Sequence, residues 1–237
     1  MIDFKSYWAD KKSNMNRRED SNYYDKKATE HISFISQYGK SKSVTDFGCG
    51  AGELLSRYVD LMPADYRGID FSDSLLRRAR ETVPESVVLE NANALQAARL
   101  EEAEAWTACG SVNQYLSELE MVQFFEAFED NEMVKSVYLF DTIDPSKYVL
   151  FSLELLSSYN ARPALNGIKY IFRVLRSFSA LLTFNPNRNP VVPLGNMGYG
   201  YQTAFWMALA DEKGWDVEIV SSFVFEYRYH VRISKKD

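Results

Sequence analysis

The sequence predicts an α/β domain in which helices cover both faces of a mostly parallel sheet of seven strands. Two observations predict this fold. Short apolar segments of strand character alternate with amphipathic helical segments, and the first strand runs into a glycine-rich turn. The chain has 237 residues, of which 46% are hydrophobic, and this length and composition suit one such domain with a sizeable core.

Strands and helices alternate through the first 145 residues. Ala28, Ile32 and Ile35 recur at helical spacing in the first helix, and Ser72 or Asp73 is suited to cap a later one. The predicted helices cover residues 23–37, 52–61, 72–82 and 117–131, and the predicted strands cover residues 43–47, 66–70, 86–90, 105–109 and 136–141. Ligands of such sheets bind beyond the carboxyl ends of the strands, so the residues that follow each strand are the candidates for a site.

The second half departs from this alternation. A helical insert is predicted over residues 147–182, with a break at 161–163, and a loop rich in Pro and Asn follows at 185–190. A helix over 202–213 and strands over 216–221 and 225–233 close the sheet, the last strand being antiparallel. One domain thus has four parts, namely an N-terminal lid or helix (1–38), a cofactor-binding half (39–145), a helical acceptor-binding insert (146–201) and the closing elements (202–237).

Composition excludes several classes of protein. No apolar run approaches the roughly 18 residues of a membrane helix, and the N-terminus has no signal-peptide pattern, so we expect a cytoplasmic protein with no membrane partner. Two cysteines and two histidines suggest neither a disulfide framework nor a metal site. A net charge of −6 argues against broad affinity for nucleic acid. The sequence does not predict an oligomeric state.

The glycine-rich turn favours a particular kind of ligand. Its glycines have the spacing G-x-G-x-G, whereas a dinucleotide-binding turn has G-x-G-x-x-G. Asp46 stands two positions before the first glycine, and an acid there opposes a pyrophosphate but suits a ligand with an ammonium group. Asp70 ends the second strand about 20 residues later, the usual place for a carboxylate that binds ribose hydroxyls.

This pair of features resembles motif I and the following acidic motif of class I S-adenosylmethionine-dependent methyltransferases, over roughly residues 40–145. The resemblance implies a Rossmann-like fold and S-adenosylmethionine as methyl donor. It also implies the contacts of single residues: Asp46, Gly48, Cys49, Gly50 and Gly52 beside the methionine moiety, Asp70 at the ribose, Phe71 at the adenine, Asn93 with Ala94 at the adenine amine, and Gly110 with Ser111 near the sulfonium. Asn93 is equally suited to a turn, and we expect Cys49 to fill the loop rather than to act as a nucleophile.

The acceptor side is less defined. Asn113, Gln114 and Tyr115 follow the fourth strand and are suited to orient an acceptor or to cap the next helix, and the Asx-Pro-Pro-aromatic motif of amide and DNA methylation is absent there. Asp141 after the fifth strand and His230 in the last strand are the candidate general bases. A structural role is the alternative for His230, and we expect His31 to pack structurally.

The predicted insert is cationic. No acidic residue stands between Glu154 and Asp211, and Lys169, Arg173 and Arg176 form one stripe of a helix. A solvated helix face is the ordinary explanation, but such faces normally mix charge signs, so we expect an anionic acceptor such as a phosphorylated or nucleotide-linked sugar. Two tyrosines flanked by glycines, Tyr199 and Tyr201, suggest a hinge, a stacking surface for substrate or a tight turn.

These features predict a methyltransferase that acts on a hydroxyl of a small, anionic molecule. N-methylation of an amino sugar or amine is the first alternative, because it needs less base catalysis. A non-catalytic protein that binds S-adenosylmethionine or a partner is the second. An RNA methyltransferase is compatible with the cationic stripe but not with the acidic chain as a whole.

Overall fold

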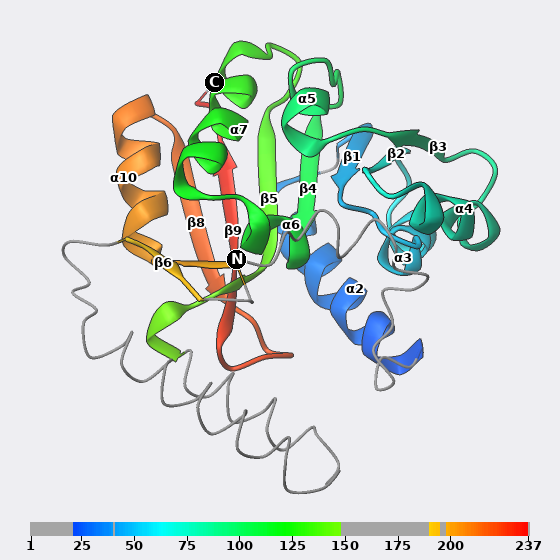
Figure 1. Ribbon diagram of the computed structural model, residues 1–237, viewed down its shortest axis with the longest axis horizontal. Helices are drawn as coiled ribbons and strands as arrows, with labels where there is room; N and C mark the ends of the chain where they lie inside the picture. Colours follow the sequence, from blue (N-terminus) through cyan, green and yellow to red (C-terminus); the bar gives the residue numbers. More distant parts are fainter. Residues whose placement is uncertain (1–20, 40, 148–189, 195–197, 237) are drawn as a thin grey trace, which may run out of the picture.

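A seven-stranded sheet organises the computed structural model, which describes residues 21–39, 41–147, 190–194 and 198–236 (Figure 1). The strand order is β3-β2-β1-β4-β5-β9-β8, and every neighbouring pair is parallel except those that β9 makes with β5 and β8. The strands are β1 (Ser43–Phe47), β2 (Asp65–Asp70), β3 (Val88–Asn91), β4 (Ala105–Cys109), β5 (Ser136–Ile143), β8 (Asp216–Ser221) and β9 (Arg228–Ser234). This arrangement confirms the predicted Rossmann-like fold with an antiparallel last strand.

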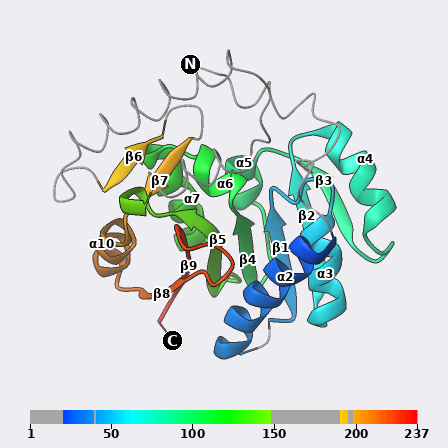
Figure 2. The same cartoon turned by 90° about the horizontal axis from the view of Figure 1, so that it is seen from below.

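Helices cover both faces of the sheet (Figure 2). One face carries α2 (Ser21–Ile35), α3 (Glu53–Leu61) and α4 (Asp73–Thr82), and the other carries α5 (Ala94–Ala98), α7 (Glu118–Asp130) and α10 (Thr203–Lys213). Two apolar cores result, one on each face: Trp106, Phe124, Phe128 and Trp206 belong to the second, and Leu55, Tyr58 and Phe140 to the first. Within the described residues, no helix is both long and apolar enough to cross a membrane.

Two helices begin at the capping residues that the sequence offers. The Ser72 hydroxyl accepts a hydrogen bond from the Leu75 N–H at 3.4 Å, so that Ser72 rather than Asp73 is the N-cap of α4. Ser117 and Glu120 form a reciprocal capping box at the start of α7. These caps determine where α4 and α7 begin, and therefore which residues belong to the loops before them.

The sequence does not predict three short elements. Helix α5 and helix α6 (Ser111–Tyr115) have five residues each, too few for a periodic pattern. The third is a hairpin of β6 (Val191–Pro193) and β7 (Tyr199–Tyr201), where the sequence suggests a hinge, a stacking surface or a tight turn. Short 3₁₀ turns also cover Ser36–Tyr38 and Pro145–Lys147.

Much of the predicted lid and insert lies outside the described residues. This applies to residues 1–20 and 148–189, and therefore to Lys169, Arg173 and Arg176. The four-part division of the domain stays a prediction at these boundaries.

A β-bulge interrupts the pairing of β5 with β9. Leu139 pairs with Val231 and Thr142 pairs with Tyr229, so two residues of β5, Phe140 and Asp141, face one residue of β9. Asp141 has a φ of 55°, a left-handed conformation that costs a non-glycine residue on the order of 1 kcal/mol. The bulge turns the Asp141 side chain out of the ladder, toward α2.

Glycine at position 198 is a requirement of the hairpin. Gly198 has a φ of 84°, and a Cβ there would lie 1.8 Å from the backbone oxygen of Gln114 in α6. Gly214, which ends α10, has a similar φ of 68° with nothing within 4 Å of its Cβ position. Substitution of either glycine would therefore strain the backbone, but only substitution of Gly198 would also cause a steric clash.

We predict that Gly198→Ala destabilises the protein much more than Gly214→Ala. The Gly214 variant should lose about 1–2 kcal/mol from backbone strain, whereas the Gly198 variant should lose about 3 kcal/mol or more because the hairpin must also move away from α6. Urea unfolding of the two variants measures both costs. Equal losses would show that the hairpin does not pack on α6 as described.

Candidate functional site

The glycine turn after β1 has a backbone that other residues cannot adopt without strain. Gly48, Gly50 and Gly52 have φ angles of 73°, 60° and 83°. The N–H groups of Gly48 and Cys49 both donate to the Ile69 carbonyl, at 2.7 and 3.0 Å, which joins the turn to the end of β2. A Cβ on Gly48 would lie 2.1 Å from a methyl carbon of Val112. The turn thus brings bare backbone to the carboxyl ends of β1, β2 and β4.

Asp46 is a buried carboxylate with no cationic partner among the described residues. Its side chain in β1 is 4% exposed, and it accepts a hydrogen bond from the Thr107 hydroxyl at 2.8 Å. Burial raises the pKa of Asp46 to about 7, against the lowering effect of Thr107, and Asp70 adds to the rise. Such a group is stabilised as an anion when a ligand brings positive charge next to it.

Asp70 is held in place by the turn. Its Oδ2 accepts the Gly50 N–H at 3.0 Å, and its Oδ1 accepts the Ser72 N–H at 2.9 Å. Burial raises the pKa of Asp70, and these backbone hydrogen bonds oppose the rise. The backbone N–H groups of Gly50, Phe71 and Ser72 leave part of the carboxylate's acceptor capacity unused, and Phe71 is 37% exposed. This combination offers acceptors for hydroxyl groups beside an exposed aromatic face.

The remaining residues of the predicted cofactor site have mixed placements. Asn93 is the N-cap of α5, with its Oδ1 accepting the Leu95 N–H at 2.9 Å, and Ala94 is the first residue of that helix. Cys49 is buried over Gly68, and burial raises its thiol pKa well above the usual value, as expected of a residue that fills space. Gly110 follows β4, and Ser111 begins α6.

Two of the predicted acceptor residues hold elements together. The Asn113 amide is 1% exposed and donates to the Phe140 carbonyl at 2.9 Å and to the Thr142 hydroxyl at 3.3 Å. Tyr201 is fully buried, and its hydroxyl donates to the Leu116 carbonyl at 2.6 Å, so Tyr201 offers no surface to a substrate here.

Three other predicted acceptor residues lie beside Gly110 or around the hairpin. The Gln114 amide nitrogen is 4.0 Å from the Cβ position of Gly110. Tyr115 and Tyr199 are half-buried around the hairpin contact. Of the predicted acceptor residues in the described part of the chain, Gln114 therefore approaches the end of β4, whereas the others lie at or anchor α6 and the hairpin.

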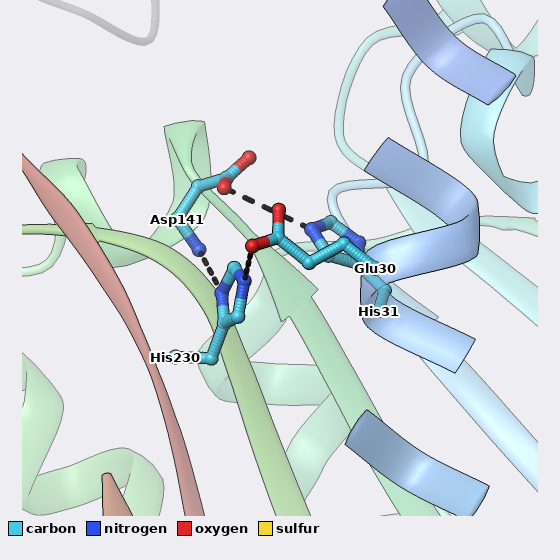
Figure 3. A group of neighbouring side chains, drawn as sticks. All are labelled: Glu30, His31, Asp141 and His230. Carbon is cyan, nitrogen blue, oxygen red and sulfur yellow. Dashed lines mark hydrogen bonds and ion pairs between the residues drawn. The ribbon is translucent and has the colours of Figure 1, made fainter. Parts of the chain in front are cut away.

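Asp141 and His230, the candidate bases, belong to a buried network with Glu30 and His31 of α2 (Figure 3). The Asp141 N–H donates to Nδ1 of His230 at 3.1 Å, and Nε2 of His230 lies 3.2 Å from Oε1 of Glu30. Nε2 of His31 lies 3.8 Å from Oδ1 of Asp141, and the His31 ring stacks on Phe140. All four side chains are at most 3% exposed.

Lys27 supplies the main charge partner of this network. Its Nζ lies 2.5 Å from Oδ2 of Asp141 and 3.5 Å from Sγ of Cys109. Burial opposes ionisation of Asp141, but Lys27, His31 and Arg228 outweigh it and hold the Asp141 pKa well below its usual value. Burial likewise opposes the charge on Lys27, but Asp141, Cys109 and Tyr23 together outweigh it and raise the Lys27 pKa. Both groups are therefore charged.

Hydrogen-bond directions define the protons in the network. Because Nδ1 of His230 accepts an N–H, a neutral His230 ring carries its proton on Nε2, directed at Glu30. Burial lowers the pKa of His31 to about 4, so this ring is neutral, with Nδ1 2.5 Å from the Tyr58 hydroxyl. Neither His230 nor Asp141 has the exposed, unengaged lone pair that a general base needs, and the Asp141 pKa is too low for that role.

The same four residues have the composition of a metal site. One ligand atom from each lies within 4.8 Å of the others. However, a metal ion would have to displace the proton from Nε2 of His230 and share Asp141 with the Lys27 ammonium, 2.5 Å away. The Lys27 ammonium already pairs with the Asp141 carboxylate, so we assign no metal to this cluster.

Known proteins resemble both the motif and the fold. Residues 44–130 match a family of methyltransferase domains. The chain contains an S-adenosylmethionine-dependent methyltransferase domain. This domain runs from β1 to α7 and so includes the glycine turn, Asp46, Asp70 and Gly110, but neither α2 nor β9. No curated protein sequence matches the chain.

Solved structures share the fold of this chain both within residues 44–130 and beyond them. The methyltransferase domain of bacterial CtHen1 has a TM-score of 0.56 and 16% identity, covering 91% of this chain and all of that one. Magnesium protoporphyrin IX methyltransferase from Synechocystis PCC 6803, with bound S-adenosylhomocysteine, has a TM-score of 0.55, 13% identity and coverage of 91% and 83%. DhpI with S-adenosylhomocysteine has a TM-score of 0.58, 11% identity and coverage of 96% and 93%.

Two residues near the end of β4 were not singled out by sequence reasoning. Lys27 belongs to α2, and Arg228 begins β9, where its Nη1 lies 3.3 Å from the Cβ position of Gly110. Alternation in β9 places Arg228 on the face that carries His230, which is the signal that could have found it. Lys27 has no such signal, because its partners are distant in sequence.

We predict that Asp46→Asn stabilises the ligand-free methyltransferase at pH 8. Folded Asp46 has a pKa of about 7 and an ordinary aspartate about 3.8, so the folded state retains a proton that the unfolded chain loses between these values. Wild-type stability should therefore fall as the pH rises from 4 to 7, by about 2–4 kcal/mol from this group. Urea unfolding from pH 4 to pH 8 measures it.

The asparagine variant should lack this fall, and should bind S-adenosylmethionine about tenfold or more weakly because the ammonium loses its carboxylate. Asp65→Asn, at the exposed start of β2, is the matched control. Parallel stability profiles for wild type and Asp46→Asn would contradict the assignment of a raised Asp46 pKa.

Proposed function

We propose that this methyltransferase transfers the methyl group of S-adenosylmethionine to an oxygen of a small anionic acceptor. One observation carries the proposal: two cations, Lys27 and Arg228, converge beside the carboxyl end of β4. Lys27 Nζ lies 3.5 Å from Cys109 Sγ, and Arg228 Nη1 lies 3.3 Å from the Cβ position of Gly110. By resemblance to the family, the sulfonium lies beside Gly110 and Ser111, so the acceptor would meet these cations.

Two buried positive charges lie near this point, and the carboxylates of Asp141 and Glu30 belong to the adjoining network. Several described groups have large effects on the pKa values of Lys27 and Arg228. Among them, Asp141 is the carboxylate that affects both. Cys109 between them stays a neutral thiol, since burial raises its pKa to about 12. Lys27 and Arg228 are 7% and 14% exposed, so their charge is only weakly solvated. An anionic group of an acceptor would balance it.

The methyl donor is assigned to the other side of Gly110. Asp46 would pair with the ammonium, since it is a buried carboxylate without a described cation, and the turn of Gly48, Cys49, Gly50 and Gly52 would line the methionine moiety. Asp70 would accept the ribose hydroxyls, with Phe71 against the adenine. Asn93 and Ala94 would lie at the adenine edge, although Asn93 Oδ1 already accepts the Leu95 N–H.

The same electrostatics favours oxygen over nitrogen as the methylated atom. An amine acceptor is an ammonium ion near neutral pH, and it would have to approach Lys27 and Arg228 before losing its proton. N-methylation of an amine is therefore the alternative that the charges oppose.

We predict that the protein binds S-adenosylhomocysteine and that Asp70→Asn weakens this binding about tenfold or more, because the ribose hydroxyls lose a charged acceptor. Isothermal titration calorimetry measures both affinities. Asp65→Asn in the same strand is the control and should bind as wild type does. A wild-type protein that binds neither S-adenosylmethionine nor S-adenosylhomocysteine would exclude the proposed function.

A transfer assay tests the acceptor class. Labelled S-adenosylmethionine is offered with phosphorylated sugars, nucleotide sugars, carboxylic acids, neutral alcohols and amines. Label should enter anionic compounds at oxygen, and transfer confined to amines would contradict the proposal.

A further inference from the structure

A polar pair interrupts the face of the sheet that α2 and α3 cover. In the pairing of β1 with β4, Val44 lies beside Ala105, and two residues further along the same face Asp46 lies beside Thr107. The first pair belongs to the apolar core, with exposed fractions of 2% and 1%. The second pair is similarly buried, at 4% and 1%, although both of its members are polar. Burying two polar groups there costs stability unless they bond to each other or to a ligand.

The two side chains do bond to each other. The Thr107 hydroxyl donates to Oδ1 of Asp46 at 2.8 Å, and within the described residues this is the hydrogen bond that the carboxylate accepts. Such a bond favours the ionised form, because a hydrogen bond to an anion is about twice as strong as one between neutral groups. Thr107 therefore opposes the burial of Asp46, and the pKa of Asp46 is about 7 under both influences and that of Asp70.

The other ionisable groups around Asp46 do not stabilise its charge. Asp70 of β2 is a second acid and raises the pKa of Asp46 further. From α2, the Lys27 ammonium is directed at Asp141, 2.5 Å away. Four weaker acids also interact with Asp46, and burial raises the pKa of each, so that all keep their protons at neutral pH: Tyr58, Tyr66, Cys49 and Cys109. Thr107 is thus the described neighbour that favours the anionic form of Asp46.

We propose that Thr107 is a positioning residue for the methyl donor, and that its hydroxyl keeps the Asp46 carboxylate ionised and fixed in place for the methionine ammonium. This inference rests on the cofactor site proposed above. Oδ1 stays on Thr107, and Oδ2 is the oxygen left for the ammonium. Because the ligand pairs with the anion, a proton leaves Asp46 whenever the donor binds to the protonated form. Donor binding is therefore linked to pH in the neutral range, and the Thr107 hydroxyl sets where it weakens.

The sign of this linkage follows from the form of Asp46 that binds. Only the ionised form attracts the ammonium, so the Kd rises about tenfold for each pH unit below the Asp46 pKa and is level above it. Removing the Thr107 hydroxyl raises that pKa, because burial and Asp70 then act unopposed. The loss therefore weakens donor binding at low pH and spares it at high pH. A purely structural loss would weaken binding by the same factor at every pH.

Two ligands separate Asp46 from the rest of the cofactor site in calorimetric titrations. S-adenosylhomocysteine carries the ammonium, whereas 5′-methylthioadenosine has the same adenosine and thioether without the amino-acid group. Thr107→Val keeps the side-chain shape and removes the hydroxyl. Its Kd for S-adenosylhomocysteine should exceed that of wild type about five- to tenfold at pH 6 and by less than about twofold at pH 8.5. Its Kd for 5′-methylthioadenosine should match wild type at both pH values. An equal loss for both ligands, or an equal loss at both pH values, would overturn the proposal.

Thr45→Val is the matched control. Thr45 is 1% exposed and also donates to a buried carboxylate, with its hydroxyl 2.7 Å from Oε2 of Glu101. It precedes Asp46 in β1 and so lies on the opposite face of the sheet, where its loss should leave both affinities unchanged. Thr107→Ser keeps the hydroxyl and should bind S-adenosylhomocysteine within about twofold of wild type. A serine variant as weak as Thr107→Val would refute the role of the hydroxyl.

Proton release by the wild-type protein tests the linkage without a variant. Titrations at pH 6 in buffers of different ionisation enthalpy count the protons released on binding. S-adenosylhomocysteine should release about one proton more than 5′-methylthioadenosine, since Asp46 is mostly protonated at this pH and the ligand ammonium stays charged. Equal release by the two ligands would overturn this inference alone. A protein that binds neither ligand would exclude the cofactor site and the methyltransferase function with it.

Discussion

The ion pair of Lys27 with Asp141 determines the geometry of the acceptor side. It joins α2 to the bulge of β5, with Nζ 2.5 Å from Oδ2, and both groups are buried. The left-handed backbone of Asp141 persists because its N–H, its carboxylate and its neighbouring rings all have partners on α2 or β9. A buried pair of this kind contributes little net stability, but losing one member leaves an uncompensated charge. The pair therefore specifies where α2 lies over the sheet.

Two buried aspartates at the same edge of the sheet have opposite electrostatic environments. Burial without a described cation raises the pKa of Asp46 to about 7, whereas Lys27, His31 and Arg228 outweigh burial and lower that of Asp141. The first is stabilised by an incoming cation, and the second is already neutralised within the protein. Both residues are aspartates buried in strands of the same sheet, so the opposite pKa shifts come from their partners.

The sequence predicts the fold and the cofactor turn because both depend on local patterns. Glycine spacing, the capping residues Ser72 and Ser117 and the alternation of strands and helices each act within a few residues. The state of Asp141 cannot be predicted this way, since it depends on Lys27 and on His230, which is 89 positions away. Helices α5 and α6 escape prediction for a different reason, because five residues hold less than two turns.

The two halves of the site follow from this division. Residues 44–130 carry the features that the methyltransferase family shares, whereas Lys27 and Arg228 come from elements on either side of that segment. On the proposed reaction, a positive sulfonium would lie beside two cations, an arrangement that an anionic acceptor would make favourable by lying between them. Methyl transfer removes the positive charge from sulfur. The electrostatic attraction between donor and acceptor would thus weaken with the reaction.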